Sequence, residues 1–271
     1  MFERSASAGR SISFQPGKNN MTRNRPVHAF TIIEVLVVCS ILTLLISLLL
    51  PSYAKSRQAA RASMCASNVR QLSICYNAYS IDQNGLLFPY QGSKIFMPQL
   101  LQYHSGDPRI RFCPEAEADN PVSGWGGAKF AWQYGSYQGS YAVNGFMYNA
   151  QGGDVGNEGG HGFFNPALYT WPAMWYGSRW ENVPDHSRTP VFADSSWVDA
   201  WPRANETVPT IFDGRPWDIY MEMARIAIDR HDMSVNVAFM DQSARRIRLR
   251  DLWSLPWHKG WVPPNPLPAI D

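Results

Sequence analysis

The longest apolar run in the chain covers residues 30–50 and ends at Pro51. It contains one charged side chain, Glu34, near its start. A helix of this length spans roughly 30 Å, the thickness of the hydrocarbon core of a bilayer, and no other segment is long and apolar enough to do so. The pattern therefore predicts a single transmembrane helix over residues 30–51.

After Pro51 the pattern becomes amphipathic, with apolar residues recurring at spacings of three and four. The predicted buried stripe consists of Ala62, Cys65, Val69, Leu72, Tyr76 and Tyr79. Asn84 and Gly85 provide a stop signal. We expect one helix from about residue 30 to 83, bent near Pro51 because proline removes an internal hydrogen bond. Residues 52–84 would form the spine of a folded domain that covers the stripe.

Residues 85–271 are rich in loops and contain only short apolar runs, which favour strands over helices. Residues 191–193 predict one strand, and residues 234–250 predict a β-hairpin that turns at 241–243. Residues 221–228 fit either a short helix or a strand, and the glycine-rich residues 151–162 predict a surface loop. The expected fold class is α+β, with a long N-terminal helix packed on a small antiparallel sheet with long loops.

Charges around the apolar run predict its orientation in a membrane. Five basic residues and one acidic residue lie within residues 1–29, so the N-terminal side should stay cytoplasmic and the part after residue 51 should be exported. Residues 1–29 are polar, without periodicity, and predict a leader peptide. Met21 offers a second start that would shorten it. The expected location is a single-pass inner membrane protein with its C-terminal domain in the periplasm or at the cell surface.

The overall charge argues against one class of partner. The chain has 24 Lys and Arg and 22 Asp and Glu. Removal of the leader would leave the remainder near neutral to slightly acidic. Because nucleic-acid binding requires a basic face, we expect no nucleic-acid partner.

Glu34 needs an explanation beyond membrane anchoring, because an ionised carboxylate in hydrocarbon costs about 2 kcal/mol or more without a partner. The residues around it read Pro26-Val-His-Ala29 followed by Phe30-Thr-Ile-Ile-Glu34. This string resembles the processing site of type IV prepilins and type II secretion pseudopilins. The resemblance implies cleavage between Ala29 and Phe30, methylation of the new amine, and pairing of Glu34 with an N-terminal amine during assembly.

The same resemblance implies a function and a set of partners. The chain would be a structural subunit of a type II secretion or type IV pilus-like filament, with residues 30–51 in the membrane or the filament core. Its expected partners are a prepilin peptidase, other pilin or pseudopilin subunits, and the membrane. The alternative is a single-pass anchor whose exported domain binds a glycan or a protein or, as a further alternative, is a metal-dependent hydrolase.

Later segments resemble a group of planctomycete pseudopilin-like proteins that carry a C-terminal domain of unknown function. The matching pieces are residues 65–89, 112–114, 140–144 and 190–194, and a signature of His, nine residues, then Asp-Gly. His231 and Asp241 keep that spacing, with an unknown role. Gln242 replaces the glycine, which argues against any role that needs a positive backbone φ or an uncrowded backbone there.

The chain has four cysteines, and an exported domain would lie in a compartment where disulfides can form. Cys39 lies in the predicted span. Cys65 lies on the buried stripe, and Cys113 lies in a turn of the domain that covers it, so we predict a disulfide between them. Cys75 could compete for Cys113, and the alternative is that all four are reduced.

Several residues have side chains that occur in hydrolases and metal sites, namely His104, Asp185, His186, Asp194, Ser195, His231 and Asp241. No catalytic or metal-binding motif connects them. We therefore expect no enzyme activity, no cofactor and no metal ligands. We expect His231 and Asp241 to satisfy backbone groups at the ends of a strand, with metal binding as the alternative.

The chain has 11 tryptophans. Trp125, Trp132, Trp171, Trp175 and Trp180 lie among Tyr, Gly and Asn and could present flat surfaces to a glycan or a protein. In a loop-rich domain, large aromatic side chains more often provide core area, about 150–250 Å² each. We expect most of them to be buried.

Overall fold

The computed structural model describes residues 31–89, 96–104, 106–116, 124–149, 176–214 and 221–270. The predicted leader with Ala29 and Phe30, and the predicted loop 151–162, lie outside these ranges. The chain divides into two compact units, Met1–Pro51 and Ser52–Asp271. The second is called the C-terminal unit below.

The N-terminal helix α1 runs from Ile32 to Asp82, close to the predicted limits. At its start Thr31 and Glu34 bond reciprocally: the Thr31 N–H donates to Glu34 Oε2 at 2.8 Å, and the Glu34 N–H donates to Thr31 Oγ1 at 3.2 Å. This is a capping box, which satisfies two backbone donors that a helix start leaves without partners. Pro51 lies inside α1, and the bend expected near it stays a prediction.

Residues 32–50 of α1 are exposed throughout. Among the described residues, α1 is the helix with the length and apolar composition to cross a membrane. Its first part exposes hydrophobic side chains along residues 32–50, a surface that is suited to an apolar environment.

The later part of α1 has the predicted buried stripe. Ala62, Cys65, Val69, Leu72 and Tyr76 are buried and Tyr79 is partly buried. The stripe also contains polar Ser73, whose hydroxyl donates to the carbonyl of Phe239 at 2.9 Å. Because that hydrogen bond satisfies the hydroxyl, a serine is tolerated on a face that otherwise buries apolar groups.

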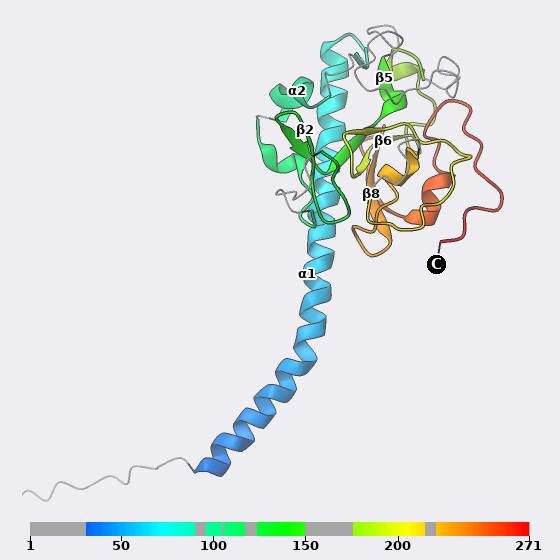
Figure 1. The fold of residues 1–271 in the computed structure, drawn as a ribbon. Coiled ribbons are helices and arrows are strands. Elements are labelled where there is room, and N and C mark those ends of the chain that lie inside the picture. Colours follow the sequence, from blue (N-terminus) through cyan, green and yellow to red (C-terminus); the bar gives the residue numbers. More distant parts are fainter. Residues whose placement is uncertain are drawn as a thin grey trace, which may run out of the picture. The chain divides into compact units, whose positions relative to one another are not determined.

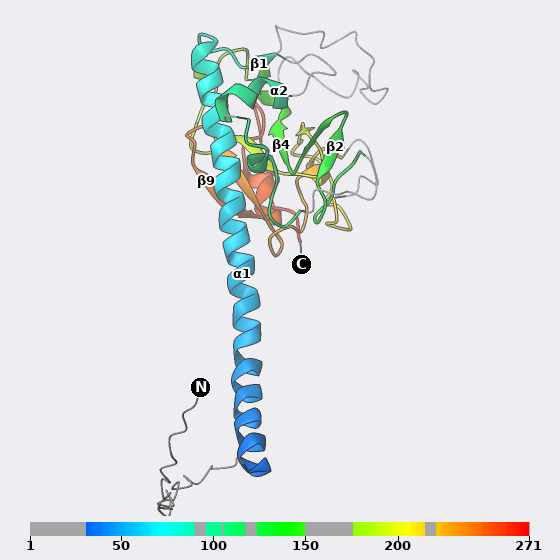
Figure 2. The ribbon, with the colours of Figure 1, turned by 90° about the vertical axis from the view of Figure 1, so that its left-hand side faces the viewer.

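A five-stranded sheet lies against this part of α1 (Figures 1 and 2). Its strand order is β7 (Asp199–Ala200), β4 (Tyr141–Asn144), β6 (Pro190–Asp194), β8 (Ser234–Phe239) and β9 (Ala244–Arg248). The pairs are antiparallel except β4 with β7. The predicted strand at 191–193 is confirmed as β6.

The other elements are short. Two further strand pairs are β1 (Phe88–Pro89) with β5 (Tyr148–Asn149), and β2 (Trp132–Tyr134) with β3 (Tyr137–Gly139). The helices are α2 (Met97–Leu100) and the 3-10 turns η1 (Leu101–His104), η2 (Pro108–Arg111), η3 (Gly145–Met147), η5 (Trp180–Asn182), η6 (Met223–Arg225) and η7 (Leu249–Ser254). Within residues 221–228, which fitted either a helix or a strand, the structure has η6.

The predicted hairpin at 234–250 is confirmed as β8 and β9, with Val235 opposite Ile247. At its turn Gln242 has φ 65°. The backbone thus has a positive φ at this position although glutamine replaces the glycine, and the turn is closed by the Gln242 N–H, which donates to the carbonyl of Phe239 at 2.9 Å. Such a closed turn can hold a non-glycine residue in the left-handed region at modest cost.

Strand β8 is buried on both faces. Val235, Val237 and Phe239 pack in one core with η7, whereas Ala238 belongs to the core that contains the stripe of α1. The sheet therefore separates two cores, and residues that point toward α1 from β6 and β8 are shielded from solvent. This position holds the site described next.

Candidate metal centre

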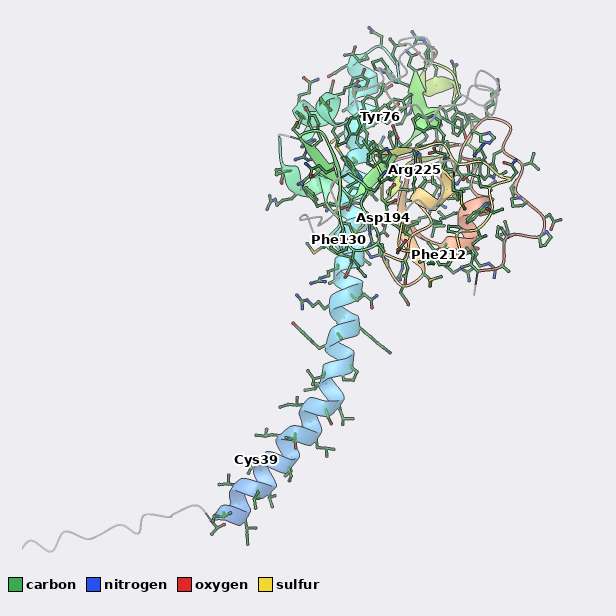
Figure 3. All side chains as sticks on the ribbon, viewed as in Figure 1. Cys39, Tyr76, Phe130, Asp194, Phe212 and Arg225 are labelled. Atoms are coloured by element: carbon green, nitrogen blue, oxygen red, sulfur yellow. The ribbon has the colours of Figure 1, made fainter. Side chains whose placement is uncertain are left out.

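Four side chains with metal-binding atoms converge between α1 and the sheet: Cys65, Cys113, Asp194 and His231. They are called the four-residue cluster below. Their potential ligand atoms all lie within 4.8 Å of one another. None is more than 1% exposed. Figure 3 labels Asp194 beside α1.

Each residue comes from a different segment. Cys65 lies on the buried stripe of α1, Asp194 ends β6, and Cys113 follows η2. His231 precedes β8 in a loop whose residues Asp232 and Met233 have φ of 58° and 52°. These two left-handed residues turn the chain tightly, and the turn is held by the N–H of Met233, which donates to the carboxylate of Asp229 at 2.7 Å.

The segment around Cys113 is fastened to α1. The Asn68 side-chain amide donates to the carbonyl of Phe112 at 3.0 Å, and Arg61 forms an ion pair with Glu115 at 3.5 Å. The Glu115 N–H also donates to the sulfur of Cys113 at 3.5 Å. These contacts hold the Cys113 sulfur next to the helix stripe.

The contacts inside the cluster are short. Cys65 Sγ lies 3.3 Å from Asp194 Oδ1, and Cys113 Sγ lies 3.4 Å from His231 Nε2. The same His231 Nε2 lies 3.3 Å from Asp194 Oδ2. The hydroxyl of Tyr141 donates to Cys65 Sγ at 3.4 Å. Each sulfur thus has one donor from outside the cluster.

Arg230 holds the carboxylate of Asp194 in place. Its NH1 lies 3.1 Å from Asp194 Oδ1, and both side chains are fully buried. The guanidinium also donates to four backbone carbonyls, those of Gly127, Ala128, Ser140 and Ser195. The Asn236 N–H donates to Asp194 Oδ2 at 2.7 Å. A buried charge with this many partners can remain ionised.

Neighbouring groups outweigh the effect of burial on the pKa of Asp194, His231 and Cys113, but not on that of Cys65. Burial raises the pKa of Asp194, but the His231 hydrogen bond and the Arg230 charge outweigh it, and the net shift is downward. Burial alone would lower the pKa of His231, yet Asp194 and Cys113 raise it to about 9. Burial raises the pKa of Cys65. Burial also acts to raise the pKa of Cys113, but hydrogen bonds from Cys65 and His231 bring it down to about 6.

The predicted partners Cys65 and Cys113 lie together, but the structure contains them as free thiols without a bond between them. Cys75, the alternative partner, is also free and its sulfur lies 3.5 Å from the carbonyl oxygen of Tyr103. The cross-link therefore stays a prediction, and it competes with any other use of these two sulfurs.

Asp241 does not join His231, although the two share the sequence signature. Its carboxylate accepts hydrogen bonds from the Ser243 N–H at 2.9 Å and from the Ser243 hydroxyl at 2.6 Å, at the exposed turn of the hairpin. Asp241 satisfies a backbone group there, as expected. His231 differs from the expectation, because its imidazole contacts the cluster instead of a backbone group.

The other candidates for a hydrolase or metal site lie outside the cluster. Ser195 donates to the carbonyl of Arg225, Asp185 accepts from Ser187, and the ring of His186 contacts Trp180. His104 lies in η1. Of the seven candidates, only Asp194 and His231 are brought together with the cysteines.

The geometry disfavours a Cys-His-Asp catalytic triad. In such a triad the two imidazole nitrogens contact different partners, whereas here Cys113 and Asp194 both contact Nε2 of His231. The buried Nδ1 has no hydrogen-bond partner in the described part of the chain.

Two surface hollows lie away from the four-residue cluster. One of about 620 Å³ lies beside Arg246 and Arg248, and one of about 490 Å³ lies beside Phe212. None of the four residues lines either hollow.

A second buried ionic group, called the acidic cluster below, contains Asp199, Glu206, Glu222, Arg203 and Arg225. Arg225 NH1 lies 2.6 Å from Glu222 Oε2 and 3.6 Å from Asp199 Oδ1. Glu206 pairs with Arg203 at 2.9 Å. Burial raises the pKa of both Asp199 and Glu206 to about 7 and also raises that of Glu222, against the charges of the arginines.

The described tryptophans are mainly structural. Trp132 is fully buried, and Trp180 packs edge-on against the ring of Tyr76. Trp125 is partly buried and stacks on Trp197 with ring centroids 4.1 Å apart. Trp171 and Trp175 lie outside the described residues.

Comparison with known proteins found no match to any family model, curated protein or solved structure. Interpretation of the cluster therefore depends on its own chemistry. The sequence analysis placed Cys65 beside Cys113 but did not predict that Asp194 and His231 join them, because Cys65 and Asp194 are 129 residues apart and Cys113 and His231 are 118 apart. The available signal was the adjacent pair Arg230 and His231 directly before the strand β8, which places a cation and an imidazole at the start of one strand.

Proposed function

We propose that this chain is a membrane-anchored, pilin-like subunit of a type II secretion or type IV pilus-like filament. The observation that carries the proposal is the division of α1. Residues 32–50 are apolar and exposed, whereas the stripe from Ala62 to Tyr76 is buried against a sheet. One helix thus combines a segment suited to lipid or to neighbouring helices with the spine of a folded domain.

Glu34 supports the proposal. It is the acidic residue in the first turn of α1 and bonds to Thr31 there. Cleavage before Phe30 would place a new amine one turn of chain from this carboxylate. The carboxylate could then exchange its local hydrogen bonds for an amine of its own or of a neighbouring subunit, which would neutralise it in an apolar environment.

The processing step provides the test. The full-length chain is expressed with an active prepilin peptidase, extracted from membranes in detergent, and its N-terminal peptide is analysed by mass spectrometry. We expect N-methyl-Phe30 as the first residue. Ala29→Trp should retain the leader because a bulky side chain blocks the cut, whereas Asn24→Gln, also in the leader, should be processed normally.

An intact leader on the wild-type chain would contradict the proposal and favour the alternative, an anchor whose domain binds a glycan or a protein. One feature favours that alternative. The stacked pair Trp125 and Trp197 is only partly buried, with Arg225 over the Trp125 ring at 5.2 Å. Stacked aromatic rings beside a cation can serve as a recognition surface.

A further inference from the structure

We propose that Cys65, Cys113, Asp194 and His231 bind one Zn²⁺ ion as a closed structural site that fastens α1 to the sheet. The proposal goes beyond the filament function and does not depend on it. It starts from the convergence of two sulfurs, one carboxylate and one imidazole nitrogen within 4.8 Å. These are the ligand types that zinc takes in proteins.

The spacing of the ligand atoms fits one tetrahedral ion. With Zn–S near 2.3 Å and Zn–N near 2.0 Å, ligand atoms around one zinc lie roughly 3.3–3.8 Å apart. With Asp194 Oδ2 as the single carboxylate ligand, the distances are 3.5 Å from Cys65 Sγ to that oxygen, 3.3 Å from that oxygen to His231 Nε2, and 3.4 Å from that nitrogen to Cys113 Sγ. Small side-chain rotations would suffice to coordinate an ion.

The formal charges also fit a divalent cation. Two thiolates, the Asp194 carboxylate and the Arg230 guanidinium sum to two negative charges when the imidazole of His231 is neutral. One Zn²⁺ ion neutralises them, so a fully buried site carries no net charge. A buried group of charges is tolerated when it is balanced in this way.

The surroundings of three of the four ligands match those of a metal site, while Nδ1 of His231 has no outer partner in the described part of the chain. The Glu115 N–H donates to Cys113 Sγ and the Tyr141 hydroxyl to Cys65 Sγ, so both sulfurs have donors suited to thiolates. Arg230 and the Asn236 N–H orient the Asp194 carboxylate. Outer partners of this kind fix the orientation of ligands before the metal arrives.

A disulfide between Cys65 and Cys113 explains less of the geometry. It would need only the two sulfurs, and it would give no reason for Asp194 and His231 to converge on them from β6 and the loop before β8. Four ligands from four segments, with no open position and no exposed atom, are characteristic of a structural metal. Zinc would link α1 to the sheet as a covalent bridge would.

The experiment measures zinc in the full-length chain purified in detergent without chelators. Elemental analysis should find one zinc per chain. Cys113→Ser should lose it, whereas Cys75→Ser, a change at another buried cysteine of α1, and Asp241→Ala should retain it. Removal of zinc from the wild type with a strong chelator should lower the Tm of the C-terminal unit by several degrees.

Cobalt substitution of the wild-type chain tests the site without any variant. Tetrahedral Co²⁺ with two thiolates gives intense visible bands and a sulfur-to-cobalt charge-transfer band, and we expect both. The proposal is overturned by a Cys65 to Cys113 disulfide in metal-free protein, by free thiols that bind neither ion, or by equal zinc in Cys113→Ser. None of these results depends on whether the leader is cleaved.

Discussion

The two buried ionic clusters of the C-terminal unit differ in how well their charges are balanced. In the four-residue cluster, Asp194 is paired with Arg230 and His231, and its pKa is lowered despite complete burial. In the acidic cluster, three carboxylates share two arginines, and the pKa values of all three are raised. Burial acts to raise every one of these pKa values, so the number and distance of the cations decide the direction.

The largest expected effect comes from breaking the balanced cluster. Arg230→Met removes the cation beside Asp194 and the donors to four buried carbonyls, which should reduce the free energy of unfolding by about 3–5 kcal/mol. The matched control is Arg250→Met, because Arg250 is exposed and lies 3.7 Å from its partner Asp251. Its cost should be below about 0.5 kcal/mol. Denaturant unfolding of the full-length chain in detergent measures both, and equal losses would contradict the comparison.

An intermediate effect is expected from pH in the acidic cluster. A carboxyl group whose pKa is raised on folding keeps its proton in the folded state over a pH range where the unfolded chain has lost it, so stability should fall as pH rises from about 4.5 to about 7. Glu206, with a pKa of about 7, contributes to this fall together with Asp199. Glu222, Arg203 and Arg225 are the charged groups that face them.

Glu206→Gln should reduce the loss of stability over this pH range by about 1 kcal/mol or more, because glutamine has no proton to lose. The readout is the Tm of wild type and variant at several pH values, because their difference cancels the contributions of other groups. Glu181→Gln is the control, since Glu181 is exposed and pairs with Arg179 at the surface. If the plot of Tm against pH for Glu206→Gln runs parallel to that of the wild type, the carboxyl group of Glu206 is not protonated in this pH range.

The smallest effect is expected outside both clusters, at Asp241. Asp241→Ala removes two hydrogen bonds at an exposed turn and should cost about 0.5–1 kcal/mol. Thermal unfolding of the full-length chain measures this. A loss as large as that of Arg230→Met would give Asp241 a role that its surroundings do not explain.

Local patterns in the sequence predicted the long helix, its stripe from Ala62 to Tyr76, the strand at 191–193 and the hairpin at 234–250. Each depends on a period of 3.6 or 2 residues within one element, and a nearby stop or turn signal. The same patterns did not reveal that Ala238 and Val237 belong to different cores, since a strand with two buried faces has no polar face to orient it.

The sequence by itself thus determined the long helix, the strand at 191–193, the hairpin at 234–250 and which residues could lie in a membrane, and it left residues 221–228 open. Only the tertiary structure decided that Asp194 and His231 join Cys65 and Cys113, and that His231 does not stay with Asp241. Periodicity acts over a few residues, whereas this cluster joins residues 118 and 129 positions apart. Their meeting depends on how α1 docks on the sheet and on the left-handed turn at Asp232 and Met233, and no spacing in the sequence records either.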